Sequence, residues 1–321
     1  MKLLVFGGTQ FLGRATVEAA LERGHDLTLF NRGQTNPDLF AEAERVRGDR
    51  AVDPLPEGEW DVVIDMPGYL PAVVRRSAEA VRDSVDRYVF VSSISVYAEF
   101  REGPTEESPR AELGELPDNE LLPTYENYPG LKALCEDVVG EVYGDRAIIV
   151  RPGLIVGPHD PTGRFTYWPH RVARGGEFIV PGQPEDQVQF IDARDLGTWL
   201  VDLCERGTTG TFNATHPGLR WTELVESCLR VTGADAQPVW IEGDWLAERG
   251  VGMWMELPLW VHGDELGGML HADVSRALAE GLTFRPLDDV VRGTLELAET
   301  TDDAGMKPER EQELIEAWRA R

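Results

Sequence analysis

The feature that most constrains this chain is a glycine-rich turn that follows a short apolar run at its start. Leu3–Phe6 has the length of a buried strand, and a helical stretch follows at Arg14–Glu22. Between them lie Gly7, which permits a tight turn, Gly8, which adds backbone freedom, and Gly13, which lets the helix pack close to the strand. The free N–H groups at the start of such a helix favour a pyrophosphate. The pattern predicts a dinucleotide-binding site, with an ordinary glycine turn as the alternative.

Apolar runs alternate with helical stretches through the first half of the chain. After the first strand, these runs lie at Asp26–Phe30, Asp61–Ile64, Tyr88–Ser92 and Ala147–Arg151. Strands separated by helical segments indicate β-α-β units and a parallel sheet that is covered on both faces. We therefore expect an α/β protein with a Rossmann, doubly wound parallel sheet.

The pattern changes after the last of these strands. We expect a Rossmann dinucleotide-binding domain over residues 1–160, with strand segments contributed by 186–215. A smaller, mainly substrate-binding α/β region is expected over 161–321. The stretch Glu99–Leu122 is rich in Pro, Glu and Gly and has no period, which predicts a long surface loop beside the site.

The charge balance restricts the partners of this chain. It has 57 Asp and Glu against 31 Lys and Arg, a formal net charge of −26. Such a surface repels nucleic acid and anionic membranes, so we expect neither as a partner. A salt-rich, halophilic cytoplasm would explain the acidic surface and predicts folding that improves in molar salt; a high-GC genome is the alternative.

No apolar run approaches the roughly 18 residues of a membrane span. There is no signal-peptide pattern, and the 3 cysteines lack metal-type spacing, so we expect a cytoplasmic protein without a metal site.

A tyrosine and a lysine have the spacing of an acid/base pair. Tyr128 and Lys132 are four residues apart, so a helix would place them on one face, one turn apart. A nearby ammonium favours the phenolate and depresses the pKa of a tyrosine. Such a phenol can remove a proton from a hydroxyl while a hydride leaves the attached carbon. Lys132 is also one of few lysines in an Arg-rich chain, which is consistent with a role that needs a compact point charge.

These features resemble the extended short-chain dehydrogenase/reductase family, also called the NAD-dependent epimerase/dehydratase family, over roughly residues 1–215. Gln10 stands where the family's G-x-x-G-x-x-G fingerprint has its middle glycine, as in atypical members. The stretch Val91–Tyr97 is similar to the family's S-S-x-x-V-Y signature. The resemblance implies that Ser93 is catalytic together with Tyr128 and Lys132, and Ser95 is the second choice for the serine. The alternative is that these serines are strand-end hydroxyls that cap the next turn. The cofactor-binding residues that the resemblance and the turn imply are Gly7, Gly8, Thr9, Gln10, Phe11, Leu12, Gly13, Asn31, Arg32, Asp49, Tyr128, Lys132, Pro152 and Gly153.

The end of the second predicted strand bears on the choice of cofactor. Sites specific for NAD usually place Asp or Glu there, against the ribose 2′-OH. This chain has Asn31 and Arg32 instead, and Arg32 could bind a 2′-phosphate. The sequence therefore favours NADP(H), while NAD(H) stays open because Arg32 could be a solvated loop charge. The resemblance implies that Asp49 accepts from the adenine amino group.

The resemblance also implies the class of reaction. It predicts an NAD(P)-dependent oxidoreductase or epimerase that acts on a hydroxyl or keto group, with a nucleotide-sugar as the expected small-molecule substrate. Family dehydratases carry an Asp-Glu pair after the catalytic serine, whereas Ile94-Ser95 follows here, so dehydration is not expected. The alternative is a non-catalytic NADP-binding protein that is regulatory or RNA-associated. Substrate contacts are expected from Arg164, Trp168 and Arg171, with core packing as the alternative for Trp168.

Relatives that dimerise often use the helix that carries the tyrosine and the lysine. Here that helix is expected over Tyr128–Tyr143. Its apolar positions could form a homodimer interface or could face the core.

Overall fold

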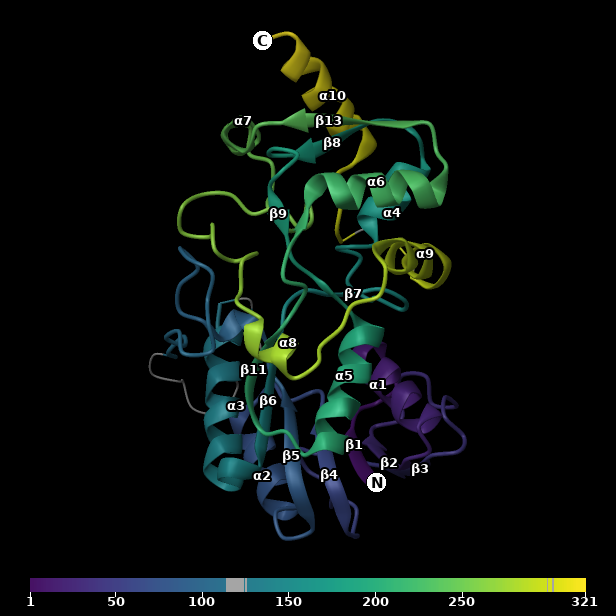
Figure 1. The fold of residues 1–321 in the computed structure, drawn as a ribbon, viewed down its shortest axis with the longest axis vertical. Helices are drawn as coiled ribbons and strands as arrows, with labels where there is room; N and C mark the ends of the chain where they lie inside the picture. The colour runs from purple at the N-terminus through teal and green to yellow at the C-terminus, as the bar shows by residue number, and fades with distance from the viewer. Residues whose placement is uncertain (114–123, 125, 299, 302) are drawn as a thin grey trace.

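The computed structural model describes residues 1–113, 124, 126–298, 300, 301 and 303–321. Its N-terminal part is built on a seven-stranded sheet in which every neighbouring pair is parallel (Figure 1). In spatial order its strands are β11 (Gly210–Ala214), β6 (Ala147–Pro152), β5 (Val85–Val91), β4 (Trp60–Asp65), β1 (Lys2–Phe6), β2 (Asp26–Asn31) and β3 (Glu44–Arg47). The predicted α/β class with a Rossmann sheet is confirmed.

Two pairs of helices cover the two faces of this sheet. Helices α1 (Phe11–Glu22) and α5 (Ala193–Arg206) share one apolar core with alternate residues of the central strands. Helices α2 (Pro71–Ala80) and α3 (Tyr128–Tyr143) share a second core with the residues in between. This alternation follows from the two-residue period of a strand. It explains why these strands appear in the sequence as nearly continuous apolar runs.

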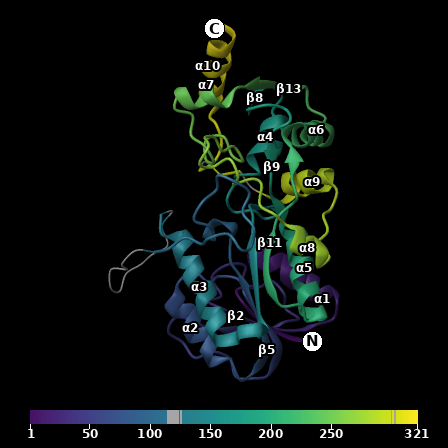
Figure 2. The same ribbon diagram turned by 60° about the vertical axis from the view of Figure 1, so that its left-hand side comes forward.

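The C-terminal part is a smaller α/β lobe with its own core (Figures 1 and 2). Its parallel strand pair consists of β8 (Gly176–Pro181) and β13 (Ala236–Ile241). Its helices are α4 (Tyr167–Ala173), α6 (Trp221–Thr232), α7 (Gly243–Glu248), α9 (Leu287–Leu297) and α10 (Pro308–Arg319). The remaining short elements are η1 (Ile94–Val96), η2 (Gly144–Arg146), β7 (Ile155–Val156), β9 (Gln187–Val188), β10 (Ile191–Asp192), β12 (Leu219–Arg220) and α8 (Ser275–Ala279).

Two segments that are far apart in the sequence cross between the lobes. Gly268 N donates to Phe100 O at 2.6 Å, and Asp273 N donates to Pro104 O at 2.9 Å. A Cβ at Gly103 or at Gly268 would collide with the backbone of the opposite segment. The described part of the predicted Glu99–Leu122 loop is therefore held against the C-terminal part of the chain. Residues 114–122 of that loop lie outside the described residues.

Several local predictions can be compared with the structure. The expected helix Tyr128–Tyr143 is confirmed as α3. Strand β3 was not predicted, because Glu44–Arg47 alternates charged residues with one valine at the sheet edge. Most apolar positions on α3 face the core, namely Leu131, Val138, Val139 and Val142. Within the described residues, no helix is long and apolar enough to cross a membrane.

Candidate active site

The residues that the sequence singled out gather at the carboxyl edge of the sheet. The glycine turn follows β1, Asn31 ends β2, Ser93 follows β5, and Pro152 ends β6. Tyr128 is the first residue of α3, which packs against η1 just beyond Ser93. Ligands of open α/β sheets bind at this edge because the strand ends and their loops meet there.

The glycine turn has the geometry of a phosphate-binding turn. Gly7 and Gly8 have φ angles of 97° and 92°, which favour glycine. A Cβ at Gly13 would lie 3.0 Å from Gly8 N and Cα, so the helix approaches the strand closely. Gln10 is exposed, its side chain does not cap α1, and the first turn of α1 has no acidic residue. The helix N-terminus can thus receive a pyrophosphate, and the residues present fit a dinucleotide. The turn is completed by Thr9, Phe11 and Leu12.

Asn31 joins this turn to the second strand. Its Nδ2 donates to Gly7 O at 2.8 Å, and its Oδ1 accepts from Gly33 N at 2.9 Å. Asn31 therefore holds the end of β2 against the glycine turn. Arg32 follows it on the surface and is exposed.

Two further predicted cofactor contacts lie on neighbouring turns. Asp49 Oδ1 accepts from Ala51 N at 2.9 Å, so one of its oxygens is held by its own turn. Pro152 is buried at the end of β6, and Gly153 N donates to Ala214 O at 3.0 Å. Both turns stand at the same sheet edge as the glycine turn, and their roles toward a cofactor stay predictions.

Lys132 is buried beneath the site. Its side chain is 2% exposed, and Nζ donates to Gly68 O at 2.8 Å and to Val91 O at 2.7 Å. The ammonium also lies over two rings, with Nζ 4.4 Å from the centre of Phe90 and 5.4 Å from that of Tyr69. Burial lowers the pKa of Lys132 to about 8. Among the described residues, no carboxylate forms an ion pair with it.

Tyr128 does not have the depressed pKa that the four-residue spacing predicted. Burial, with a smaller contribution from the nearby Tyr69, raises the pKa of its phenol to about 12. Ser93 and Arg164 act in the opposite direction, Ser93 through a hydrogen bond and Arg164 through its charge. Burial is the largest cause, and the Lys132 ammonium donates to the backbone carbonyls of Gly68 and Val91. In this form the phenol is protonated at neutral pH and can donate a proton.

Ser93 has two partners at the start of η1. Its Oγ accepts from Ser95 N at 3.1 Å and lies 3.0 Å from Ser95 Oγ. Ser93 therefore caps the short helix and also lies within reach of the Tyr128 hydroxyl. The structure places Ser93 beside Tyr128, and the Lys132 ammonium binds the end of the strand that precedes Ser93; the catalytic roles of the three residues stay predictions.

Tyr69 and Trp254 also border this group; the sequence is equally compatible with Tyr69 lining the pocket or packing in the core, and it gives Trp254 no role. Tyr69 is 46% exposed, and its ring centre lies 6.4 Å from that of Tyr128. Arg164 reaches the same region from the C-terminal lobe, because its charge acts on Tyr128 and its guanidinium carbon lies 5.5 Å from the centre of the Trp254 ring. Trp254 had no local signal, since only the fold brings residues around 254 next to Arg164.

The other two expected substrate contacts lie in the core of the C-terminal lobe. Trp168 is 1% exposed, and its Nε1 donates to Pro258 O at 3.0 Å. Arg171 is buried, and its Nε donates to Glu311 Oε2 at 2.6 Å. Both side chains already have structural partners, so the structure does not support the expectation that Trp168 and Arg171 contact substrate.

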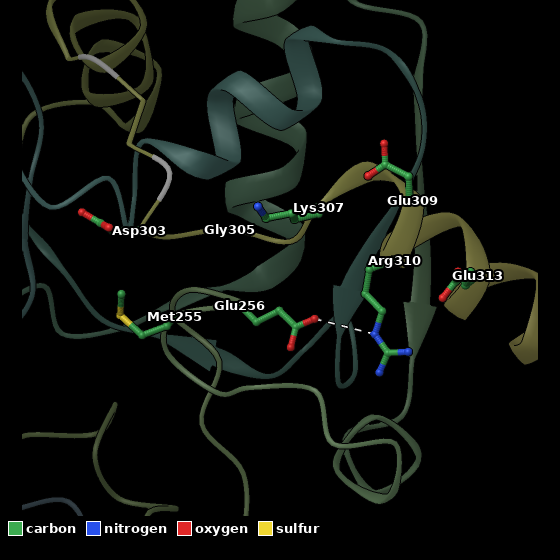
Figure 3. A pocket seen from close by; sticks show the side chains of 8 residues that line it. All are labelled: Met255, Glu256, Asp303, Gly305, Lys307, Glu309, Arg310 and Glu313. Atoms are coloured by element: carbon green, nitrogen blue, oxygen red, sulfur yellow. Dashed lines mark ion pairs between the residues drawn. The ribbon is translucent and has the colours of Figure 1, made fainter.

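A separate hollow of about 630 Å³ lies beside the N-terminus of α10 (Figure 3). Arg310 Nε lies 3.8 Å from Glu256 Oε1 across it. None of its lining residues belongs to the group around Tyr128. No cluster of three or more metal-ligating side chains occurs within the described part of the chain.

Comparison with known proteins gives a consistent result. The model of the NAD dependent epimerase/dehydratase family matches residues 3–214. A UDP-glucuronic acid 4-epimerase from Bacillus cereus, solved with NAD, has a similar fold, with a TM-score of 0.65 at 16% identity over 91% of this chain and 97% of that one. The UDP-glucose 4-epimerase from Thermotoga maritima, solved with UDP-glucose, gives 0.64 at 17% identity over 92% of this chain and 98% of that one.

One curated relative has a different kind of name. The chloroplast stem-loop binding protein of 41 kDa b from Arabidopsis thaliana is 23% identical over 255 residues, which is 72% of this chain. The chain spans 63% of the length of that relative.

Proposed function

The chain belongs to the NAD dependent epimerase/dehydratase family, and on this premise we propose that it is an NAD(P)-dependent oxidoreductase or epimerase that acts on a hydroxyl or keto group of a nucleotide-sugar. The observation that carries the proposal is the grouping of Ser93 and Tyr128 above the buried Lys132, at the same sheet edge as the glycine turn.

In this proposal the three side chains act on one substrate oxygen. Ser93 orients that oxygen by a hydrogen bond, and Tyr128 exchanges a proton with it as the attached carbon loses or gains a hydride. Lys132 supplies a positive charge behind the phenol, which favours the phenolate as the proton leaves. NAD(P), when bound, supplies the hydride acceptor or donor. Gly7, Gly8 and the N-terminus of α1 would hold its pyrophosphate.

NADP(H) is the favoured cofactor. The second strand ends without a carboxylate for a ribose 2′-OH, and Arg32 is exposed there. NAD(H) is the alternative, since NAD is the nucleotide bound in the Bacillus cereus structure.

We further propose that the C-terminal lobe, which lies within residues 161–321 and excludes α5 and β11, binds the substrate. Arg164 supports this, because its charge already acts on Tyr128 from that lobe and it lies over the ring of Trp254. A guanidinium beside an indole suits a ligand that combines an anionic group with a flat ring, as a nucleotide-sugar does.

The test is a cofactor titration followed by a substrate screen. NADPH and NADH are titrated by their fluorescence, and nucleotide-sugars are then screened for epimers or for cofactor consumption. Tyr128→Phe should keep cofactor binding and lower turnover by about 10²- to 10⁴-fold, the usual contribution of a general acid/base. Tyr143→Phe, which removes a phenol elsewhere on α3, is the control and should keep turnover. Full activity of the Tyr128→Phe protein would refute the proposal.

A second candidate is a non-catalytic nucleotide-binding protein that contacts RNA. The name of the Arabidopsis relative favours it, and the net charge of −26 opposes it. Titration of an RNA stem-loop at low salt should show no binding, and saturable binding together with absence of turnover would favour this candidate.

A further inference from the structure

Most arginines in this chain have an acceptor, and the exceptions are not scattered. In the part of the chain that the structure describes, those without a hydrogen bond or ion pair are Arg32, Arg45, Arg47, Arg82 and Arg174. Three of these lie at the end of β2 or on β3. In a chain with 57 acidic residues, such a group without carboxylate partners calls for an explanation.

The register of the sheet places these three arginines together. Arg45 is paired with Leu29 and Arg47 with Asn31, while Arg32 follows Asn31 directly. Arg45 and Arg47 are two residues apart on one strand, so they share a face of the sheet. This is the sheet face that α1 covers, because Leu29, the residue paired with Arg45, belongs to the core between α1 and the sheet.

The surroundings of two of the three guanidinium groups, those of Arg47 and Arg45, can be described. A Cβ at Gly33 would lie 3.0 Å from Arg47 Nε, so Arg47 lies across the turn that follows Arg32. Arg45 Nε and Nη2 are buried and have no hydrogen-bond partner. Buried N–H groups of a charged side chain without an acceptor carry a large desolvation penalty, so an anion that reaches them is strongly favoured.

This edge is also where a Rossmann site places the adenosine ribose. Asn31 holds the end of β2 against the glycine turn, so Arg32, which follows Asn31, and Arg47, which is paired with it, lie at the strand end nearest the proposed pyrophosphate site. The carboxylate of Glu44, the acidic residue on β3, is already bonded by Thr28 Oγ1 at 3.0 Å. Guanidinium groups bind phosphate monoesters in bidentate geometry, and a ribose 2′-phosphate is such a group.

We infer that Arg45 and Arg47 join Arg32 in a binding site for a phosphate monoester, and that this site takes the 2′-phosphate of NADP(H). The inference rests on the proposed function and adds two residues that the strand-end pattern alone does not identify. It predicts that the protein binds NADPH more tightly than NADH, and that Arg45 and Arg47 on β3 account for most of the difference in affinity.

The test measures binding rather than turnover. The full chain is titrated with NADPH and NADH, and with adenosine 2′-monophosphate and 5′-monophosphate as smaller probes. Arg47→Gln and Arg45→Gln should each weaken NADPH and the 2′-monophosphate by about tenfold, the effect expected for one charge-assisted contact, and leave NADH unchanged. Arg174→Gln, an unpaired exposed arginine after α4, is the matched control and should change neither affinity. Thermal melts of each variant verify folding. If Arg45→Gln misfolds, Arg47→Gln still tests the inference, because Arg47 is exposed and its substitution should not disturb the fold.

The outcomes separate this inference from the proposed function. Equal binding of NADH and NADPH, or variants that weaken both equally, would overturn the 2′-phosphate site and leave the proposed function standing. Binding of neither nucleotide would overturn both. A tenfold loss confined to the 2′-phosphorylated ligands would establish the site.

Discussion

Two buried cations, one in each lobe, show how differently this chain uses a positive charge. Lys132 on α3 is 2% exposed and donates to two backbone carbonyls, while Arg171 on α4 is 7% exposed and is paired with the carboxylate of Glu311. Arg171 also donates to Gly175 O at 3.0 Å. The charge of Arg171 is thus compensated inside the core of its lobe. The charge of Lys132 is solvated only by dipoles and rings.

The difference teaches what each buried charge does. A paired cation such as Arg171 fixes the packing of α4 against α10, and it needs its partner. A cation without a carboxylate keeps a penalty in the folded state, which appears as the lowered pKa of Lys132. Such a penalty is common where a charge serves a function rather than the fold.

The largest effect should come from breaking the compensated pair. Arg171→Met leaves the carboxylate of Glu311 buried without its partner, and we expect the free energy of unfolding to fall by about 3–5 kcal/mol. Denaturant unfolding measures it. The double variant Arg171→Met with Glu311→Leu removes both charges and should recover much of the loss. A single variant as stable as the parent would show that Arg171 is not a compensated core charge.

A smaller, pH-dependent effect should mark Lys132. Its pKa is about 8 in the folded chain and 10.5 in a free side chain. Between these values the unfolded state binds more protons, so the stability contribution of this residue rises with pH from 8 to 10.5, by about 3 kcal/mol in total. The measurement is the difference in unfolding free energy between the parent and Lys132→Met across this range, which cancels the titration of groups that do not interact with Lys132. A flat difference would mean that Lys132 is not desolvated.

The smallest effect should come from the ring that covers Lys132. Tyr69→Ala admits water beside the ammonium, which raises the pKa of Lys132 toward its ordinary value and reduces the pH-dependent difference by about 1 kcal/mol. Tyr69→Phe keeps the ring and should leave that difference unchanged. If Tyr69→Ala gives the same pH profile as the parent, burial by other residues accounts for the lowered pKa.

The sequence predicted correctly those strands and helices that are determined by a local pattern of residues. Apolar runs identified the central strands of the sheet, and the spacing of Tyr128 and Lys132 placed them correctly on α3. Strand β3 was not predicted, because a charged strand at the edge of the sheet lacks an apolar run. At the start of α5, Asp192 is the N-cap and Asp195 binds Arg285 from a distant segment, a pairing that no local pattern indicates.

The chemical state of the site could not be predicted from spacing. Helical periodicity places an ammonium near a phenol, but it does not show that Lys132 finds closer acceptors in Gly68 and Val91. Trp168 and Arg171 were expected to contact substrate, and only tertiary packing reveals that they belong to a core. The pairing of Arg47 with Asn31 likewise depends on strand register, which the sequence leaves open once β3 is missed.

The crossing of Gly103 and Gly268 has a consequence for the way the protein is made. A ribosome releases the loop after Ser93 long before it releases the segment that holds that loop in place. Domains fold as they emerge, N-terminal parts first. The glycine turn and its strands can therefore form on a nascent chain, while the surroundings of Tyr128 are completed only after Gly268 has left the exit tunnel. We therefore expect the glycine turn to take its final form during synthesis before the surroundings of Tyr128 do.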